Sequence, residues 1–390
     1  MRRLVACLPV LAVLGLLASL ARGPAGADQP ARGLVTPAAR EAIDRGLSFL
    51  ASQQHTDGSW KSNAGKKINE GYRIFEGGRD VPHVGVTSLA VLAYLAGGHV
   101  PGRGPYGEVV ERAVRFLVEQ GDPGSGMIAA HGTRMYSHAF ATLALAEVYG
   151  MSPQPRVRRV LEAAVDFTVR CQNETGGWRY VPFTADSDMS VTVCQVVALR
   201  AARNVGFKVP QATIDRAIGY VLRSAYTGAE ARGGFRYQPE EIRWNRDSFS
   251  LAAAGLTTLF QAGLYDNAAI ARYVKEHRIP QSPPPRIEDT VRYLRNQFSD
   301  VPNDHFFFWY GSYYATQAFY LVGGSNPQEW SGWYTAVRDR ILATQREARL
   351  PGGQRGAHWV SNVDDSHAYA TATALLILQF PLDYLPIHQR

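Results

Sequence analysis

Two aspartates separated by one residue have the spacing and the setting that acid–base chemistry needs. Asp186 and Asp188 stand in the segment Asp186-Ser187-Asp188-Met189-Ser190, directly before an apolar stretch. A carboxylic acid that its surroundings keep protonated can donate a proton to a substrate. An aspartate at the start of a helix also stabilises the helix as an N-cap and through the helix dipole. Asp188 and Asp186 are therefore candidate catalytic residues, and the capping role of Asp188 stays open.

Further polar side chains stand near the predicted starts of other apolar helices. They are His83, Tyr136, His138, Asp247, Ser248, Asp304, His305, Asp364, Asp365 and His367. The aspartates can serve as N-caps, and the histidines can be solvated or hydrogen-bonded residues of a rim. The candidate ligand-binding residues among them are His138, His305, Asp365 and His367. A metal site built from Asp364, Asp365, His367 and His305 is an alternative, but we predict no metal and no cofactor.

The densest aromatic run of the chain, residues 306–314, is a candidate wall of a cavity. On a helix, Trp309 and Tyr313 lie on one face, and Tyr310 and Tyr314 lie beside them. Aromatic faces attract cations through their quadrupoles, and a hydrophobic core is the alternative use of the same residues. Hydroxyl groups are costly in a dry core, which favours a wet cavity. The candidate ligand-binding residues here are Trp309, Tyr310, Tyr313 and Tyr314.

Two kinds of helical segment alternate along the chain and would position these residues. Segments with charges on one face, typical of an outer layer, are predicted at 36–54, 107–120, 155–172, 211–225, 285–298 and 328–345. Alanine-rich segments that are apolar nearly all round, typical of buried helices, are predicted at 83–96, 136–149, 188–204, 248–262, 306–322 and 366–379. An extra helix is predicted at 267–278, and the apolar tail 384–387 is expected to pack back on the helices. No segment has the pattern of a β-strand.

A short element recurs where outer-type helices end. The segment 45–60 places Gln54, Gly58 and Trp60 behind an apolar helix, and the segment 167–178 repeats these residue types at the same offsets. The glycine lets the chain reverse, and the tryptophan brings a large apolar face with one N–H that needs an acceptor. Looser copies lie at 116–120, 220–235, 293–297 and 345–359. A unit that returns about every 50–70 residues indicates a repeat architecture.

The pattern R-G-x-x-F-L-x-x-x-Q-x-x-x-G-x-W at residues 45–60 resembles the QW motif of the prenyltransferase and squalene oxidase repeat. This repeat marks the superfamily of class II terpenoid cyclases and protein prenyltransferase β subunits. The resemblance implies an all-α, single-domain α/α toroid of about six helical hairpins, with outer and inner helices in two rings around a central cavity. It also implies that the Gln and Trp residues tie successive hairpins together.

The same resemblance implies a role for Asp188. Residues 186–190 are similar to the Asp-x-Asp-Asp-Thr signature of class II cyclases, whose middle aspartate protonates an alkene or an epoxide, and Asp188 falls on that position. Met189 replaces the last aspartate, and the chain is long enough for a single toroid only. The prenyltransferase branch fits less well, because its zinc site needs an Asp-x-Cys pair. Neither Cys171 nor Cys194 has an aspartate two residues earlier.

The first 27 residues have the features of a signal peptide. Arg2 and Arg3 precede an apolar run, and small residues stand at the two positions before Asp28 that a signal peptidase reads. We predict cleavage before Asp28 and export of the mature protein, and an uncleaved membrane anchor is the alternative. The predicted organisation is a signal peptide at 1–27, a linker at 28–35 and the toroid at 36–390.

The charge and the cysteine content argue against a nucleic-acid-binding protein and against a disulfide-rich or zinc-ribbon fold. Loss of the leader with its three arginines lowers the formal net charge from +7 to about +4, which is too weak and scattered for nucleic-acid binding. No CxxC pair is present, so a disulfide-rich or zinc-ribbon fold is not indicated. Cys171 and Cys194 are expected to be buried free thiols, and a disulfide bond between them is the alternative.

Two functional classes remain. One is an exported toroid that binds an apolar, polyprenoid-like small molecule or a macromolecule in its cavity, either without catalysis or with weak activity only. The other is a terpenoid cyclase-type isomerase that uses Asp188 as its general acid. Export, Met189 and the single ring favour the binding protein, while the acidic rim and the aromatic wall support the enzyme. A peripheral contact with a membrane stays open, and the sequence gives no oligomeric state.

Overall fold

The computed structural model describes residues 33–64, 81–130, 134–229, 231–239 and 249–388. The predicted signal peptide 1–27 lies outside these ranges, as do Asp247, Ser248 and residues 65–80.

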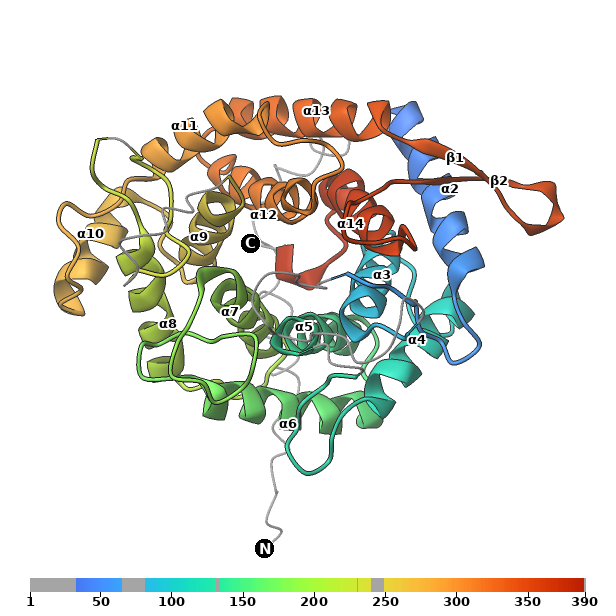
Figure 1. Cartoon of the computed structure of the whole chain (residues 1–390), viewed down its shortest axis with the longest axis horizontal. Coiled ribbons are helices and arrows are strands. Elements are labelled where there is room, and N and C mark those ends of the chain that lie inside the picture. The colour runs from blue at the N-terminus through green and yellow to red at the C-terminus, as the bar shows by residue number, and fades with distance from the viewer. Residues whose placement is uncertain (1–32, 65–80, 131–133, 230, 240–248, 389–390) are drawn as a thin grey trace, which may run out of the picture.

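The helices form two concentric rings (Figure 1). The inner ring consists of α3 (Val84–Ala96), α5 (Met135–Met151), α7 (Met189–Asn204), α9 (Phe249–Gln261), α12 (Phe306–Val322) and α14 (Ala368–Gln379). The outer layer consists of α2 (Pro37–Gln53), α4 (Gly107–Glu119), α6 (Pro155–Cys171), α8 (Gln211–Ser224), α10 (Asn267–Glu276), α11 (Ile287–Phe298) and α13 (Pro327–Ala343). Successive inner helices pack on one another, and α14 packs on α3 and closes the ring. The predicted α/α toroid is thereby confirmed.

The two rings differ in how much of each helix is buried. Every residue of α3 is buried, because its sequence VGVTSLAVLAYLA offers no charged face. In contrast, α4 buries only the face that carries Val110, Val114 and Leu117. Among the described helices, none is both long and apolar enough to cross a membrane. The predicted helix bounds agree with the observed ones to within about two residues, the usual uncertainty of helix ends.

The glutamine of the recurring element joins two successive outer helices. Gln54, directly after α2, donates from Nε2 to the carbonyl oxygens of Gly58 (3.0 Å) and of Val109 in α4 (2.8 Å). Arg112 of α4 donates back to Gln54 Oε1. A Cβ atom on Gly58, whose φ is +91°, would lie 2.3 Å from the Arg112 carbonyl oxygen, so only glycine allows this close approach.

Gln172 makes the same contacts between α6 and α8. Its Nε2 donates to the carbonyl oxygens of Gly176 (2.8 Å) and of Thr213 (2.8 Å), and Arg216 donates to its Oε1. Each carboxamide therefore bonds its own turn and the next outer helix at once. We call this set of contacts the glutamine tie.

The tryptophan of the element links the outer ring to the inner ring. Trp178 Nε1 donates to the carbonyl oxygen of Thr168 in α6 (2.9 Å), and the Trp178 backbone N–H donates to the Thr192 hydroxyl in α7 (3.1 Å). The equivalent bonds join Trp60 to Leu50 and Thr87, and Trp359 to Ile341 and Thr371. All three indoles are buried, which removes their apolar area from water, and each ring N–H has a carbonyl acceptor.

Residues 346–358 contain a β-hairpin, so the prediction that the chain has no strand was wrong. Strands β1 (Arg346–Arg349) and β2 (Arg355–His358) pair antiparallel and project outward beside α2 (Figure 1). The strands are short and charged and lack the alternation that marks a strand in a sequence. Contacts with α2 hold the hairpin: Arg45 donates to the Gly356 carbonyl oxygen (3.2 Å) and to Glu347 (3.0 Å).

The C-terminal segment packs back on the ring, as predicted for the tail 384–387. It contains the short helices η2 (Phe380–Leu382) and η3 (Pro386–His388) and ends in the middle of the ring in Figure 1. Leu385 and Ile387 are buried. The Ile387 N–H donates to Oε2 of Glu147 in α5 (3.1 Å), and Oε1 of Glu147 has no hydrogen-bond partner among the described residues. Burial raises the pKa of Glu147 to about 8, although the bond from Ile387 opposes this shift.

We predict that Glu147 makes stability fall as the pH rises. The pKa of Glu147 is about 8 in the folded protein and near 4.5 in the unfolded chain, so between these values the folded protein holds a proton that the unfolded chain has lost. Glutamine does not titrate, so the Glu147→Gln variant does not lose stability in this way as the pH rises. Its free energy of unfolding relative to wild type should therefore increase by a few kcal/mol from about pH 5 to about pH 8.

Urea denaturation at several pH values measures this difference. Glu162→Gln, at an exposed position of α6, reports the effect of removing a carboxylate from the surface. A Glu147→Gln difference that stays constant over the whole pH range would contradict the prediction.

Candidate functional site

The inner helices begin at one end of the ring, which we call the N-terminal rim, and there Asp188 both caps α7 and pairs with an arginine. Asp188 Oδ1 accepts hydrogen bonds from the Ser190 hydroxyl (2.5 Å) and the Val191 N–H (2.9 Å). Asp188 Oδ2 accepts from Nη1 of Arg179 (3.1 Å), and Nε of Arg179 lies 3.1 Å from Asp186 Oδ2. Asp188 is fully buried, whereas the Asp186 side chain is 54% exposed. One guanidinium thus holds both candidate carboxylates.

Two tyrosines enclose the guanidinium of Arg179. Nη1 of Arg179 also donates to the Tyr237 hydroxyl (2.9 Å), and the hydroxyls of Tyr180 and Tyr237 share a short hydrogen bond. The guanidinium carbon lies 4.7 Å from the centroid of the Tyr180 ring and 5.5 Å from that of the Tyr237 ring. Cation–π attraction therefore adds to the ion pairs. We call Arg179, Tyr180, Asp186, Asp188 and Tyr237 the arginine cluster.

Backbone bonds position the cluster on the helix starts. The carbonyl oxygen of Tyr180 accepts from the Met135 N–H at the start of α5 (3.1 Å), and that of Tyr237 accepts from the Met189 N–H at the start of α7 (2.8 Å). The first N–H groups of a helix lack partners within the helix. The segments that carry the cluster supply these partners and are fixed by them.

Ser190 connects α7 with two other inner helices. Tyr136 of α5 donates to the Ser190 hydroxyl (2.5 Å), and Tyr310 of α12 donates to the Ser190 carbonyl oxygen (3.0 Å). In the inner ring α9 stands between α7 and α12 (Figure 1), so the Tyr310 bond joins two helices that are not neighbours. Burial raises the pKa of Tyr136 and of Tyr310 well above the usual tyrosine value, which keeps both phenols neutral.

A second contact between α7 and α12 lies next to the first. Cys194 Sγ is 3.2 Å from the Tyr314 hydroxyl, and the rings of Tyr310 and Tyr314 are 4.8 Å apart. Burial raises the pKa of Cys194 to about 12, so the thiol is neutral at physiological pH and a poor nucleophile. Cys171 is also buried and free, as expected from the sequence.

The surroundings of Asp188 favour a structural carboxylate. Burial raises the pKa of Asp188, and the bonds from Ser190 and Arg179 oppose that shift. Both carboxylate oxygens accept hydrogen bonds from protein donors. A proton on Oδ2 would displace Arg179 and leave a guanidinium that is only 8% exposed without its buried partner.

His138 lies in the core and apart from the arginine cluster. Its Nδ1 accepts from the Ile128 N–H (3.0 Å), and its Nε2 is 2.8 Å from the Thr168 hydroxyl of α6. His138 is fully buried, and burial lowers its pKa to about 4. Neither ring nitrogen of this candidate is left for a ligand.

The aromatic run of α12 divides between two directions. Trp309 Nε1 donates to the Val360 carbonyl oxygen (2.9 Å), and the indole borders a cavity of 380 Å³ with Asp304 and Arg346. Tyr313, which is 4% exposed, packs on Tyr314 with ring centroids 5.1 Å apart. Tyr310 and Tyr314 therefore reach α7, and Trp309 bonds the segment after β2.

The remaining candidates lie elsewhere around the ring. His305 caps α12, with Nδ1 accepting from the Phe307 N–H (3.2 Å). Asp365 is exposed and exchanges two hydrogen bonds with Asn63, and His367 stacks on His358 with ring centroids 4.8 Å apart. Within the described ranges, no three His, Cys, Asp or Glu side chains are grouped to hold a metal ion.

Arg179, Tyr180 and Tyr237 are not among the site residues predicted from the sequence. The sequence does contain a signal for them. In two copies of the recurring element the aromatic residue is followed by Arg-Tyr, as Trp178-Arg179-Tyr180 and as Phe235-Arg236-Tyr237. Comparison of the residues that follow each aromatic would have brought these two segments together.

We predict that Asp188→Asn destabilises the protein. The asparagine oxygen can still cap α7, but Arg179 loses its buried counter-charge. Breaking a buried ion pair from one side typically costs about 3–5 kcal/mol of unfolding free energy. Asp186→Asn is the matched control, because it removes the exposed partner of the same guanidinium and should cost less than about 1 kcal/mol. Chemical denaturation measures both, and a fully stable Asp188→Asn variant would show that the ion pair does not support the fold.

No protein-family model matches the chain, and no curated protein sequence matches it. Several solved structures are similar to the chain. A cellobiose 2-epimerase from Spirochaeta thermophila is similar with a TM-score of 0.59 and 14% identity, covering 92% of this chain and 99% of the epimerase. A GH76 α-1,6-mannanase from Salegentibacter has a TM-score of 0.54 and 9% identity, covering 87% of this chain and 98% of the mannanase.

A type II terpene cyclase from Scytonema, in complex with geranylgeranyl dihydroxybenzoate, has a TM-score of 0.53 and 13% identity, covering 89% of this chain and 98% of the cyclase. These proteins perform different reactions. At sequence identities this low, the similarity is informative about the fold alone. The chain has the same α/α toroid fold as these three proteins, which is the fold that the QW-like motif implied.

Proposed function

We propose that this protein is an exported binding protein without catalytic activity, and that a macromolecular ligand docks on its N-terminal rim. Export is supported by Arg2, Arg3 and the apolar run before Asp28. The absence of catalysis is supported above all by one observation: protein donors occupy both oxygens of Asp188.

The interior of the ring argues against a polyprenoid chamber. Cyclisation started by a proton needs an acid that faces an apolar cavity, followed by aromatic faces that hold the cation. Here Tyr310 and Tyr314 reach across the ring to α7, and their hydroxyls contact Ser190 and Cys194. These contacts place phenol hydroxyls, rather than bare aromatic faces, against the first turns of the helix that Asp188 caps.

Exposed aromatic side chains favour a ligand on the rim. Phe183, in the segment between α6 and α7, is 62% exposed, and Phe307, in the first turn of α12, is 43% exposed. Exposed aromatics around polar groups are typical of protein interaction sites. Asp186, which lies three residues after Phe183 in the same segment, has a half-exposed side chain and adds a charge that a ligand can contact.

The alternative function is that of a terpenoid cyclase with Asp188 as its general acid. It is supported by the position of Asp188 in a motif that resembles the cyclase signature and by the similarity to the Scytonema cyclase fold. It requires that Asp188 exchange its bond with Arg179 for a contact with the substrate.

Incubation with squalene and with shorter polyprenyl substrates, read by gas chromatography and mass spectrometry, separates the two functions. We expect no cyclic product from the mature protein. A product that disappears in the Asp188→Asn variant, tested under conditions where the variant is folded, would establish the cyclase.

Photo-crosslinking in the native host tests the rim. A photoreactive phenylalanine analogue at Phe183 should form adducts with a macromolecule. The same analogue at Tyr265, which is 56% exposed at the other end of the ring, is the matched control and should not form them. Equal adducts at both positions, or none at Phe183, would contradict docking at the N-terminal rim.

A further inference from the structure

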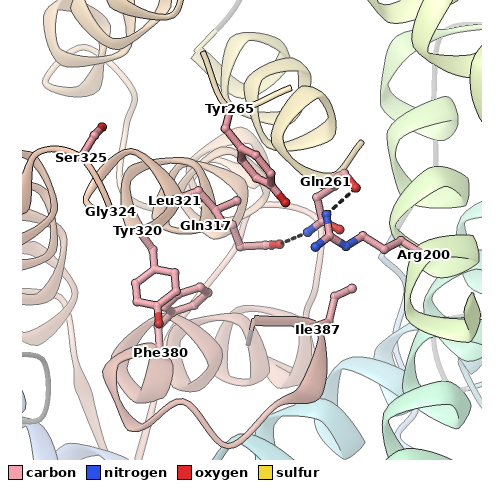
Figure 2. A pocket seen from close by; sticks show the side chains of 10 residues that line it. All are labelled: Arg200, Gln261, Tyr265, Gln317, Tyr320, Leu321, Gly324, Ser325, Phe380 and Ile387. Carbon is pink, nitrogen blue, oxygen red and sulfur yellow. Dashed lines mark hydrogen bonds between the residues drawn. The ribbon is translucent and has the colours of Figure 1, made fainter. Parts of the chain in front are cut away.

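A second concave site lies at the opposite end of the ring, where the inner helices finish. We call this end the C-terminal rim. A cavity of 420 Å³ opens there between the last turns of α7, α9 and α12 and the C-terminal segment (Figure 2). Its volume lies within the range of about 300–1,000 Å³ that is usual for small-molecule sites.

Arg200, which has no carboxylate partner among the described residues, lies at one end of this cavity. Arg200 Nη1 donates to the carbonyl oxygens of Phe260 (3.4 Å) and Gln261 at the end of α9. Nε and Nη2, which share the other edge of the guanidinium, make no hydrogen bond with any described residue, and no described carboxylate lies within ion-pair distance of Arg200. An Nε–Nη2 edge is the geometry that binds a carboxylate with two parallel hydrogen bonds.

Two carboxamides lie beside the guanidinium. Gln261 Nε2 donates weakly to Gln317 Oε1 (3.3 Å), as Figure 2 shows, and the Gln261 Oε1 atom is buried with no hydrogen-bond partner in the described part of the chain. An unpaired buried acceptor is costly. A protonated or hydroxyl-bearing ligand group, or a water brought with the ligand, would satisfy it.

The other end of the cavity is apolar. Tyr320 and Phe380 meet edge to face with ring centroids 5.2 Å apart. Leu321 and Ile387 add apolar lining between these rings and Arg200. In Figure 2 these rings lie across the cavity from Arg200. A cation at one end and an aromatic–aliphatic wall at the other match a molecule with one anionic head and one apolar body.

We propose that this cavity binds a small amphipathic monocarboxylate, with its carboxylate on the Nε–Nη2 edge of Arg200 and its apolar body against Tyr320, Leu321 and Phe380. A capping role for Arg200 at the end of α9 uses Nη1 alone and leaves this edge available. The site lies at the other end of the ring from the arginine cluster, so it does not depend on the function proposed there.

Calorimetric titration of the whole mature protein with octanoate, and with 1-octanol as the uncharged probe of equal length, tests the proposal. Octanoate should bind at least about tenfold more tightly than 1-octanol, because charge-assisted hydrogen bonds between a carboxylate and a guanidinium are stronger than a bond to a neutral hydroxyl. Arg200→Gln should weaken octanoate binding by about tenfold or more and leave 1-octanol binding nearly unchanged.

Two further variants keep the test decisive. Arg203→Gln removes an exposed arginine of the same helix that bonds Gln211 and should leave octanoate binding unchanged. Leu321→Trp fills the apolar end and should abolish binding of both probes, even if Arg200→Gln proves unstable. No octanoate binding, equal affinity for both probes, or full affinity in Leu321→Trp would overturn the proposal.

Discussion

The glutamine tie is the interaction on which the rest of this ring depends. A toroid of hairpins has no sheet to hold successive units in register, so each hairpin must be fixed to the next by side chains. Gln54 and Gln172 do this with one carboxamide each, by bonding their own turn and the backbone of the next outer helix. Buried backbone carbonyls need hydrogen-bond donors. The tie therefore fixes the position of each hairpin relative to the next, in addition to stabilising their contact.

The tie also determines where the candidate site residues can lie. Six residues after Gln172, Trp178 is fixed by bonds to α6 and α7. Arg179 follows at once, so its guanidinium meets Asp188 at the start of α7. The same arrangement explains why an aspartate in a catalytic-looking motif works as a cap and ion-pair partner. The C-terminal rim is built differently, from helix ends and the tail, and this difference leaves the edge of Arg200 open.

Much of the fold, but little of the site, could be predicted from the sequence. Helix positions follow from composition and period, which are local properties, and the turn residues marked the ends of the outer helices. The direction of a side chain on an inner helix is not local, because α12 is apolar on every face. Tyr310 and Trp309 therefore could not be assigned to different sides. His138 bonds Thr168 of a neighbouring helix, and contacts with α2 hold the charged β-hairpin. Both features depend on contacts between segments that are far apart in the sequence.

Hydrogen–deuterium exchange of the Gln172→Ala variant, read by mass spectrometry, tests the central role of the tie most directly. The carboxamide of Gln172 bonds Gly176 and Thr213, which lie in different hairpins. If the tie holds the hairpins in register, the variant should exchange faster both in the turn 172–178 and in the first turns of α8. Faster exchange confined to residues 172–178, with α8 protected as in wild type, would contradict this account.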